Sequence, residues 1–77
     1  ALDMVNFGPM DTVPERLRGR RLHVHIPSVT LMRTTPEENA QLGEWIGERV
    51  SASTGPASVF VPRKGVSALD REGGPFW

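Results

Sequence analysis

Apolar side chains occur in short runs along the chain, and the spacing within each run indicates a type of secondary structure. Residues 2–7 form an apolar run, interrupted by Asp3 and Asn6 and closed by a Gly-Pro pair, which predicts a buried strand. Ala1 belongs to the same apolar run. Residues 21–26 alternate between apolar and polar side chains and stop at a proline, which predicts a second strand.

A third strand is predicted over residues 57–62, where the apolar run Val59-Phe60-Val61 is ended by a proline. The pattern of residues 28–33 fits either a short extended segment or an ordered loop. The sequence between residues 10 and 19 carries turn signals and room for one helical turn at most. The C-terminal residues 63–77 are rich in glycine and predict a loop.

The clearest pattern is a helix over residues 35–52. Thr35 is a suitable N-cap, Pro36 suits the first helical position, and Glu38 completes a capping box. Apolar residues then follow at i, i+3, i+4 and i+8 on one face: Leu42, Trp45, Ile46 and Val50. A Gly-Pro pair at 55–56 ends the element.

The succession of strand 22–26, helix 35–52 and strand 57–61 has the length of one right-handed crossover. This predicts an α/β fold: part of a Rossmann-like subdomain with about three strands and one long helix, in which the last two strands run parallel. A parallel sheet is buried on both faces, but one helix covers only one. We therefore expect the chain to be a partial domain, residues 1–77, of a longer protein.

Composition supports the same expectation. The chain has 77 residues with eight glycines, seven prolines and no cysteine, so disulfides and thiolate metal sites are excluded. The free energy from burying its apolar surface about equals the entropy cost of ordering it, which favours burial against a partner. The partner is expected to be a second copy of the chain or the remainder of the parent chain.

The charge balance and the hydropathy of the chain limit the partners and the cellular location that we expect. Nine basic and nine acidic residues balance, which argues against nucleic acid and anionic membranes as partners. No apolar stretch is long enough for a membrane span, so a cytoplasmic location is expected. Four arginines cluster within six positions and are interpreted as a solvated connection: Arg16, Arg18, Arg20 and Arg21.

Several polar residues lie where an α/β fold would bind a ligand. Arg33-Thr34-Thr35 precedes the predicted helix, where first-turn amides and a guanidinium suit phosphate or carboxylate; the alternative is that Thr35 only caps the helix. Lys64 and Ser67 follow the predicted third strand, at the edge where open sheets bind ligands. With the polar residues of the first strand, the candidate ligand-binding residues are Asp3, Asn6, Arg33, Thr34, Thr35, Lys64 and Ser67.

Two other chemistries are not favoured. His23 and His25 share one strand face, but they are the chain's only histidines and a zinc site needs three or four ligands, so no metal is predicted. Ser67, Asp70 and His25 contain the side chains of a hydrolase triad, but no GxSxG elbow surrounds the serine.

The sequence resembles one family closely along nearly its whole length. The segments LDMVNFGP, LMRTTPEE and KGVSALD, with the residues around them, are similar to consecutive blocks of the tomato mosaic virus resistance-like ATP-binding domain family, an uncharacterised protein family. In that family these blocks belong to the C-terminal region of a chain several times longer. The resemblance implies Rossmann-like subdomains, self-association and, in some members, ATP binding, but it supplies no catalytic residue for this chain.

Together these observations predict a non-catalytic piece of a C-terminal α/β subdomain that helps to form a ligand cleft for a nucleotide or small anion and an oligomer interface. ATP is expected only through the parent protein. The alternative is part of an enzyme of unknown reaction that acts on a phosphorylated or carboxylated metabolite.

Overall fold

The computed structural model describes residues 2–77; the expectation for Ala1 lies outside them. The described residues form a three-stranded sheet and one long helix, so the expected mixture of α and β structure is confirmed. The strands are β1 (Met4–Phe7), β2 (Leu22–Ile26) and β3 (Val29–Arg33), and the helix is α1 (Pro36–Ser51). Two short 3-10 turns, Met10–Thr12 and Glu15–Leu17, link β1 to β2.

The sheet has the order β1-β3-β2 and is antiparallel throughout, so the prediction of two parallel strands was wrong. The segment 28–33 is a strand: β2 and β3 form a hairpin across Pro27 and Ser28. A hairpin between adjacent segments closes a much shorter loop than a crossover does, and the entropy cost of ordering it is therefore smaller. β3 is the central strand and pairs Met4 with Arg33 on one side and His23 with Leu31 on the other.

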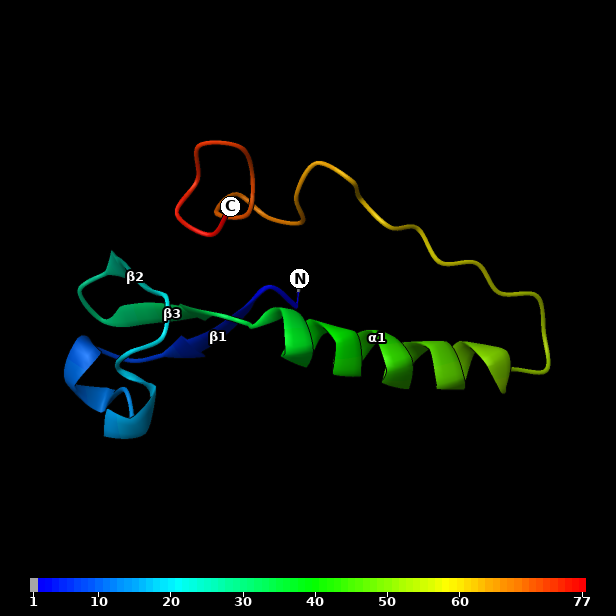
Figure 1. Ribbon diagram of the computed structural model, residues 1–77, viewed down its shortest axis with the longest axis horizontal. Coiled ribbons are helices and arrows are strands. Elements are labelled where there is room, and N and C mark those ends of the chain that lie inside the picture. Colours follow the sequence, from blue (N-terminus) through cyan, green and yellow to red (C-terminus); the bar gives the residue numbers. More distant parts are fainter. Residues whose placement is uncertain (1) are drawn as a thin grey trace.

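The predicted third strand over 57–62 is extended but belongs to no sheet in the described part of the chain. Figure 1 shows residues 53–63 as a strap, drawn in yellow, that returns alongside α1 from its far end. Within residues 2–77, no strand lies beside this segment to pair with it. The prediction of a strand over 57–62 was therefore wrong, because an apolar extended segment becomes a strand only where a neighbour supplies hydrogen bonds.

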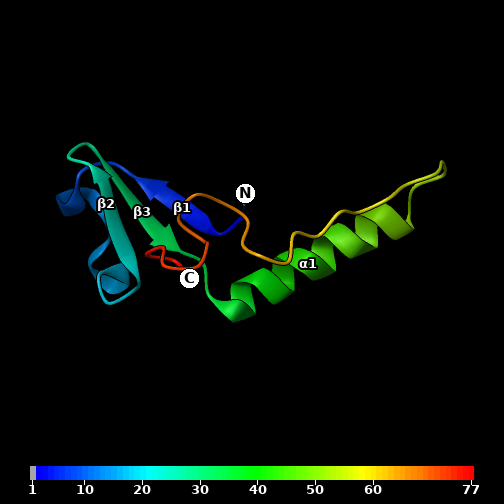
Figure 2. The ribbon, with the colours of Figure 1, turned by 90° about the horizontal axis from the view of Figure 1, so that it is seen from above.

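The helix α1 does not cover a face of the sheet, contrary to expectation. Figures 1 and 2 show it leaving the end of β3 and projecting away from the sheet. Only Thr34 and Thr35 separate β3 from α1, too few residues for the chain to fold back. None of the α1 side chains is buried, and Trp45 and Ile46 are almost half exposed.

The core is small and lies against the sheet. Its apolar members are Val13 from the turns, Leu31 and Met32 from β3, and Phe76 from the C-terminal loop. The radius of gyration is 14.9 Å, compared with about 11–12 Å for a compact domain of this length. Much apolar surface therefore remains exposed. Within residues 2–77, no helix combines the length and apolar character needed to cross a membrane.

Candidate functional site

The side chain of Arg33, at the end of the central strand, connects both ends of the chain. Its Nε donates to the carbonyl of Phe76 at 3.1 Å, and its Nη1 donates to the carbonyl of Asp3 at 3.1 Å. Its Nη2 donates to Oδ1 of Asp70 at 3.2 Å. These bonds use most of the guanidinium's donor capacity. The arginine therefore holds the N-terminal segment and the C-terminal loop against β3.

The loop after Lys64 is organised by Ser67. Its hydroxyl donates to Oδ2 of Asp3 at 2.5 Å and accepts hydrogen bonds from the amides of Leu69 and Asp70, at 3.2 and 3.1 Å. These three bonds use the hydroxyl hydrogen and both lone pairs. Ser67 therefore fixes a turn and ties it to the N-terminal segment, and it has no free lone pair for nucleophilic attack.

Asp70, considered from the sequence only as a triad member, has a different role. Its Oδ1 accepts from Arg33 and its Oδ2 from the amide of Val66 at 3.2 Å. His25 is exposed on β2, and Ser67 bonds to Asp3 instead, so the three do not form a triad. Phe76, near the end of the same C-terminal loop, is buried. Its ring packs edge to face against the ring of His23, with the two centroids 6.3 Å apart.

Thr34 and Thr35 have separate roles. The Thr34 hydroxyl donates to the carbonyl of Leu2 at 2.9 Å and accepts from the side-chain Nδ2 of Asn39 at 3.0 Å. Thr35 is the N-cap: its hydroxyl accepts from the Glu38 amide at 3.0 Å, and Glu38 accepts from the Thr35 amide at 2.8 Å. The capping box is therefore formed as the sequence predicted.

The capping box limits what the helix terminus can offer an anion. It occupies the amides of Thr35 and Glu38, and Pro36 has no amide hydrogen. The Glu37 amide is the first-turn donor left without a partner among residues 2–77. The hydrogen bond from the Thr35 amide and the neighbouring Arg20 lower the pKa of Glu38, which keeps its negative charge beside the helix terminus. An anion site here must depend on side chains rather than on helix amides.

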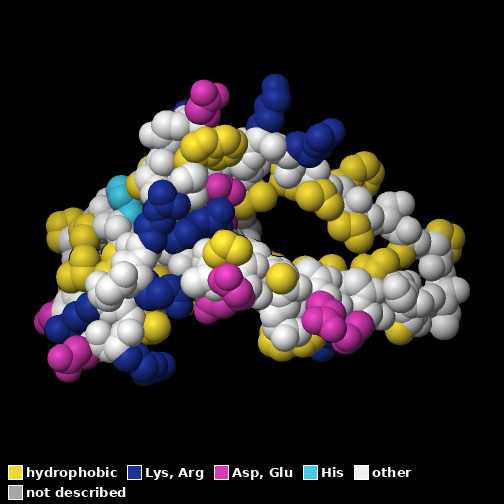
Figure 3. Space-filling view, in the orientation of Figure 1, with side chains coloured by type: hydrophobic (Ala, Val, Ile, Leu, Met, Phe, Trp, Pro, Cys, Tyr) yellow, Lys and Arg dark blue, Asp and Glu magenta, His cyan; other side chains and the backbone are white. Residues whose placement is uncertain are grey.

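Three arginines supply those side chains. A cavity of about 590 Å³ lies beside the start of α1 and is lined by Arg20, Arg21 and Arg33, together with residues of the β3–α1 junction and the C-terminal Phe76 and Trp77. Arg20 is held by Glu38 at 2.5 Å and by the carbonyl of Arg33 at 3.0 Å. Figure 3 shows basic side chains gathered beside the beginning of α1.

Arg21 is the arginine of this cavity that keeps its donors free. No hydrogen bond or ion pair to its guanidinium is found within residues 2–77, and the residue is exposed. Glu38 pairs with Arg20 and Asp70 pairs with Arg33, whereas no carboxylate side chain pairs with Arg21 among the described residues. The basic run was interpreted from the sequence as a solvated connection, and nothing in it distinguished Arg20 and Arg21 from Arg16.

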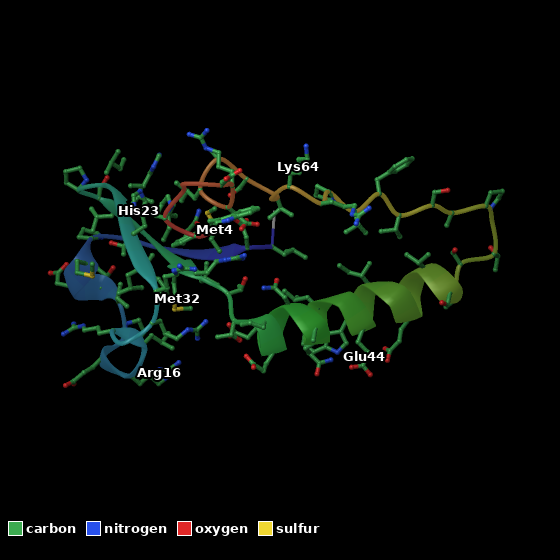
Figure 4. The ribbon with its side chains drawn as sticks, turned by 45° about the horizontal axis from the view of Figure 1, so that its top comes forward. Met4, Arg16, His23, Met32, Glu44 and Lys64 are labelled. Carbon is green, nitrogen blue, oxygen red and sulfur yellow. The ribbon has the colours of Figure 1, made fainter. Side chains whose placement is uncertain are left out.

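The predicted site residues thus separate into two groups. Asp3, Arg33, Thr34 and Ser67 belong to one hydrogen-bonded network, and Thr35 is adjacent to it. Asn6 is an exposed residue of β1 opposite Leu31. Lys64 is exposed and points away from the helix and the strands in Figure 4, and it does not line the arginine cavity. Sequence reasoning missed Arg21, Asn39 and Phe76. The contacts of Phe76 with Arg33 and His23 join distant parts of the chain, whereas Asn39 bonds to Thr34, only five positions away.

A second, smaller cavity adjoins the network. It has a volume of about 200 Å³ and is lined in part by Asp3, Asn39 and Asp70. Oδ1 of the buried Asp3 has no hydrogen-bond partner among the described residues, and a cavity of this size that includes polar side chains is large enough for water to donate to it. Among the described residues, no three His, Cys, Asp or Glu side chains are arranged to hold a metal ion.

The protein is thus a small mixed α and β unit in which hydrogen bonds from Arg33 and Ser67 join the two ends of the chain, next to a cavity lined by arginines. Comparison with known proteins identifies its family. Residues 1–77 match the model of the Uncharacterised protein family (UPF0261) C-terminal domain, and the chain belongs to this family.

Related proteins occur in bacteria and in tomato. Over 77 residues the chain is 58% identical to a UPF0261 protein of Rhizobium meliloti (strain 1021) and 53% identical to one of Clostridium tetani; each match covers 100% of this chain and 19% of the relative. It is 46% identical to the ToMV resistance protein Tm-1(GCR237) of Solanum lycopersicum, covering 100% of this chain and 10% of that protein. The chain therefore spans about a fifth of the bacterial relatives' length.

Proposed function

We propose that this chain is a binding module that supplies one cationic wall of a cleft for a phosphate or carboxylate in a longer UPF0261 protein. The observation that supports the proposal is the cavity of about 590 Å³ lined by Arg20, Arg21 and Arg33. Guanidinium groups bind planar and tetrahedral oxyanions through paired N–H donors, which makes arginine the preferred side chain for such ligands.

The three arginines have different roles in the proposed site. Glu38 and Asp70 fix the side chains of Arg20 and Arg33, and a fixed cation loses little conformational entropy when a ligand arrives. Arg21 is unpaired and supplies the donors that contact the anion. Thr34 and Asn39 also line the cavity and offer polar contacts to the rest of the ligand.

A nucleotide such as ATP is one ligand of this class, and the family resemblance favours it. Its phosphates would meet the arginine wall, while the remainder of a longer chain would supply the contacts to the base and ribose. Lys64 and Asn6 lie outside the cavity, and any role for them in binding requires surfaces from that remainder.

Binding is favoured over a Ser67-based hydrolysis because two side chains of the triad considered from the sequence are engaged elsewhere. The Ser67 hydroxyl is fully hydrogen-bonded, and the Asp70 carboxylate is held by Arg33 and the Val66 amide. Ser67 donates its hydrogen to Asp3 rather than to a histidine, so it lacks the neighbouring general base that a serine nucleophile requires.

Calorimetric titration of the chain with inorganic phosphate tests the proposal. We expect weak binding, and we expect Arg21→Ala to weaken it by about tenfold, the effect of losing a charged hydrogen bond. Arg16→Ala is the matched control: it removes the same charge from an exposed position outside the cavity, and affinity should not change. Equal losses in the two variants would mean that only net charge matters and would contradict the proposed site.

A further inference from the structure

The strap, residues 53–63 between α1 and the C-terminal loop, resembles a β-strand that has no neighbouring strand. Residues 57–62 are extended, and no backbone amide or carbonyl between residues 54 and 65 takes part in a hydrogen bond within the described chain. Unpaired backbone groups of this kind are what an edge strand presents to a neighbouring strand.

The side chains of the strap are apolar on both of its faces. Val59 is 58% exposed, Phe60 92% and Val61 75%, although consecutive residues of an extended segment point in opposite directions. A strand with one solvated face alternates between apolar and polar residues. A continuous apolar run is typical of an inner strand whose sheet is covered on both faces.

A groove beside the strap is also lined mainly by apolar residues. Its volume is about 580 Å³, and its walls include Leu42 and Ile46 from α1 and Phe60 and Val61 from the strap. The space-filling view shows an opening between α1 and the strap, bordered by hydrophobic side chains (Figure 3). The strap and the helix thus face each other across surface that water solvates poorly.

We infer that residues 58–61 form an inner strand of a larger sheet, paired on both sides with β-strands from parts of the longer UPF0261 polypeptide that lie outside these 77 residues. In this arrangement α1 covers one face of the extended sheet. Side chains of a flanking strand fill the groove beside Leu42 and Ile46, and the backbones of the two flanking strands together satisfy the free amides and carbonyls of the strap.

The flanking strands are assigned to the same polypeptide because of the lengths involved. About four-fifths of each bacterial relative has no counterpart in this chain, which is ample for further strands. Pairing within one chain also avoids the loss of translational and rotational freedom that association with a second copy entails. A four-residue strand alone is too small for the interface of a stable dimer.

Hydrogen exchange of the strap amides, followed by mass spectrometry, tests the inference. The measurement compares the isolated chain with a chimera in which its 77 residues replace the aligned residues of the Rhizobium meliloti relative. We expect the peptide covering 57–62 to exchange without protection in the isolated chain and about a hundredfold more slowly in the chimera. The unmodified relative, measured over its aligned segment, gives the same comparison if the chimera does not fold.

Two results would overturn the inference. Equally fast exchange in the isolated chain, the chimera and the relative would show that the strap gains no strand partner from the longer polypeptide. Protection in the isolated chain that rises with its concentration would assign the partner strand to a second copy instead. Within the chimera, Phe60→Asp should abolish the protection and Phe60→Leu should preserve it, because only the former places a charge in the buried sheet.

Discussion

Nη2 of Arg33 lies 3.2 Å from Oδ1 of Asp70, and this contact joins residues 37 positions apart in the chain. Both side chains are largely shielded from water, with exposed fractions of 21% and 12%. The same guanidinium also binds the carbonyls of Asp3 and Phe76, so one side chain closes the chain's two ends onto β3.

Removing this guanidinium should destabilise the protein strongly. Arg33→Ala leaves the Asp70 carboxylate without its ion pair and the Phe76 carbonyl without a donor, whereas the Asp3 carbonyl keeps the Thr34 amide; we expect a loss of about 2–4 kcal/mol. Urea unfolding followed by circular dichroism measures it. Asp70→Asn is the control, since Arg33 keeps its carbonyl contacts there, and its effect should be smaller. Equal stability of Arg33→Ala and the parent chain would show that the network is not stabilising.

The capping box gives a second prediction. Thr35→Ala removes the hydroxyl that accepts from the Glu38 amide, and we expect it to cost about 1 kcal/mol of stability. Thr35→Ser keeps the hydroxyl and should stay close to the parent chain. Denaturant unfolding of the three proteins compares them directly, and an unchanged midpoint for Thr35→Ala would show that the cap contributes nothing.

The pKa of Glu38 predicts how stability depends on pH. The Thr35 amide, followed by Arg20, lowers this pKa in the folded chain below its ordinary value of 4.5. The unfolded chain therefore takes up the proton first, and the stabilisation by Glu38 is complete above pH 4.5 and is lost as the pH falls through the folded pKa. The stability difference between the parent chain and Glu38→Gln should shrink in that acidic range.

Glu37→Gln is the control for this titration, because Glu37 lies in the same turn of α1 but outside the capping box. Comparing the two variants separates the loss of the capping carboxylate from the loss of a negative charge in the same turn. A difference between the parent chain and Glu38→Gln that stays constant down through acidic pH would contradict the assigned role of Glu38.

A backbone contact in the C-terminal loop gives a further prediction. Gly65 has φ of 101°, and a Cβ placed there would lie 1.7 Å from the carbonyl oxygen of Asp70. Gly65→Ala should therefore displace the loop and weaken the contact between Asp70 and Arg33. Gly73 also has positive φ, 80°, but has open space around it, so Gly73→Ala should cost only about 1 kcal/mol. Similar unfolding midpoints for the two variants would contradict this close approach.

The features that the sequence predicts well are those determined by neighbours along the chain. The helix over 35–52 is observed as Pro36–Ser51, because the N-cap, the proline and the apolar period all lie within it. The strand over 21–26 is observed as Leu22–Ile26, and the strand over 2–7 as Met4–Phe7. Each of these elements has its own local start and stop signals.

The features that were missed depend on contacts between distant residues. The Pro27-Ser28 turn lacks the usual hairpin signal, so β3 and the antiparallel pairing were not predicted. Asp3 and Ser67 were selected as polar residues of the first predicted strand and of the loop after the third, but their mutual contact, which spans 64 positions, was not predicted. No pattern in the sequence specifies such a pairing, nor does one reveal that Arg21 remains free while Arg20 is paired.

The central claim, that the arginine cavity is an anion site, is tested most directly by mapping where phosphate binds. Amide spectra of the ¹⁵N-labelled chain, titrated with phosphate at constant ionic strength, report each residue separately. The account predicts saturable shifts concentrated at Arg20, Arg21 and the turn that leads into α1. Shifts that do not saturate, or that are equally large at Arg16 and Arg71 outside the cavity, would contradict it.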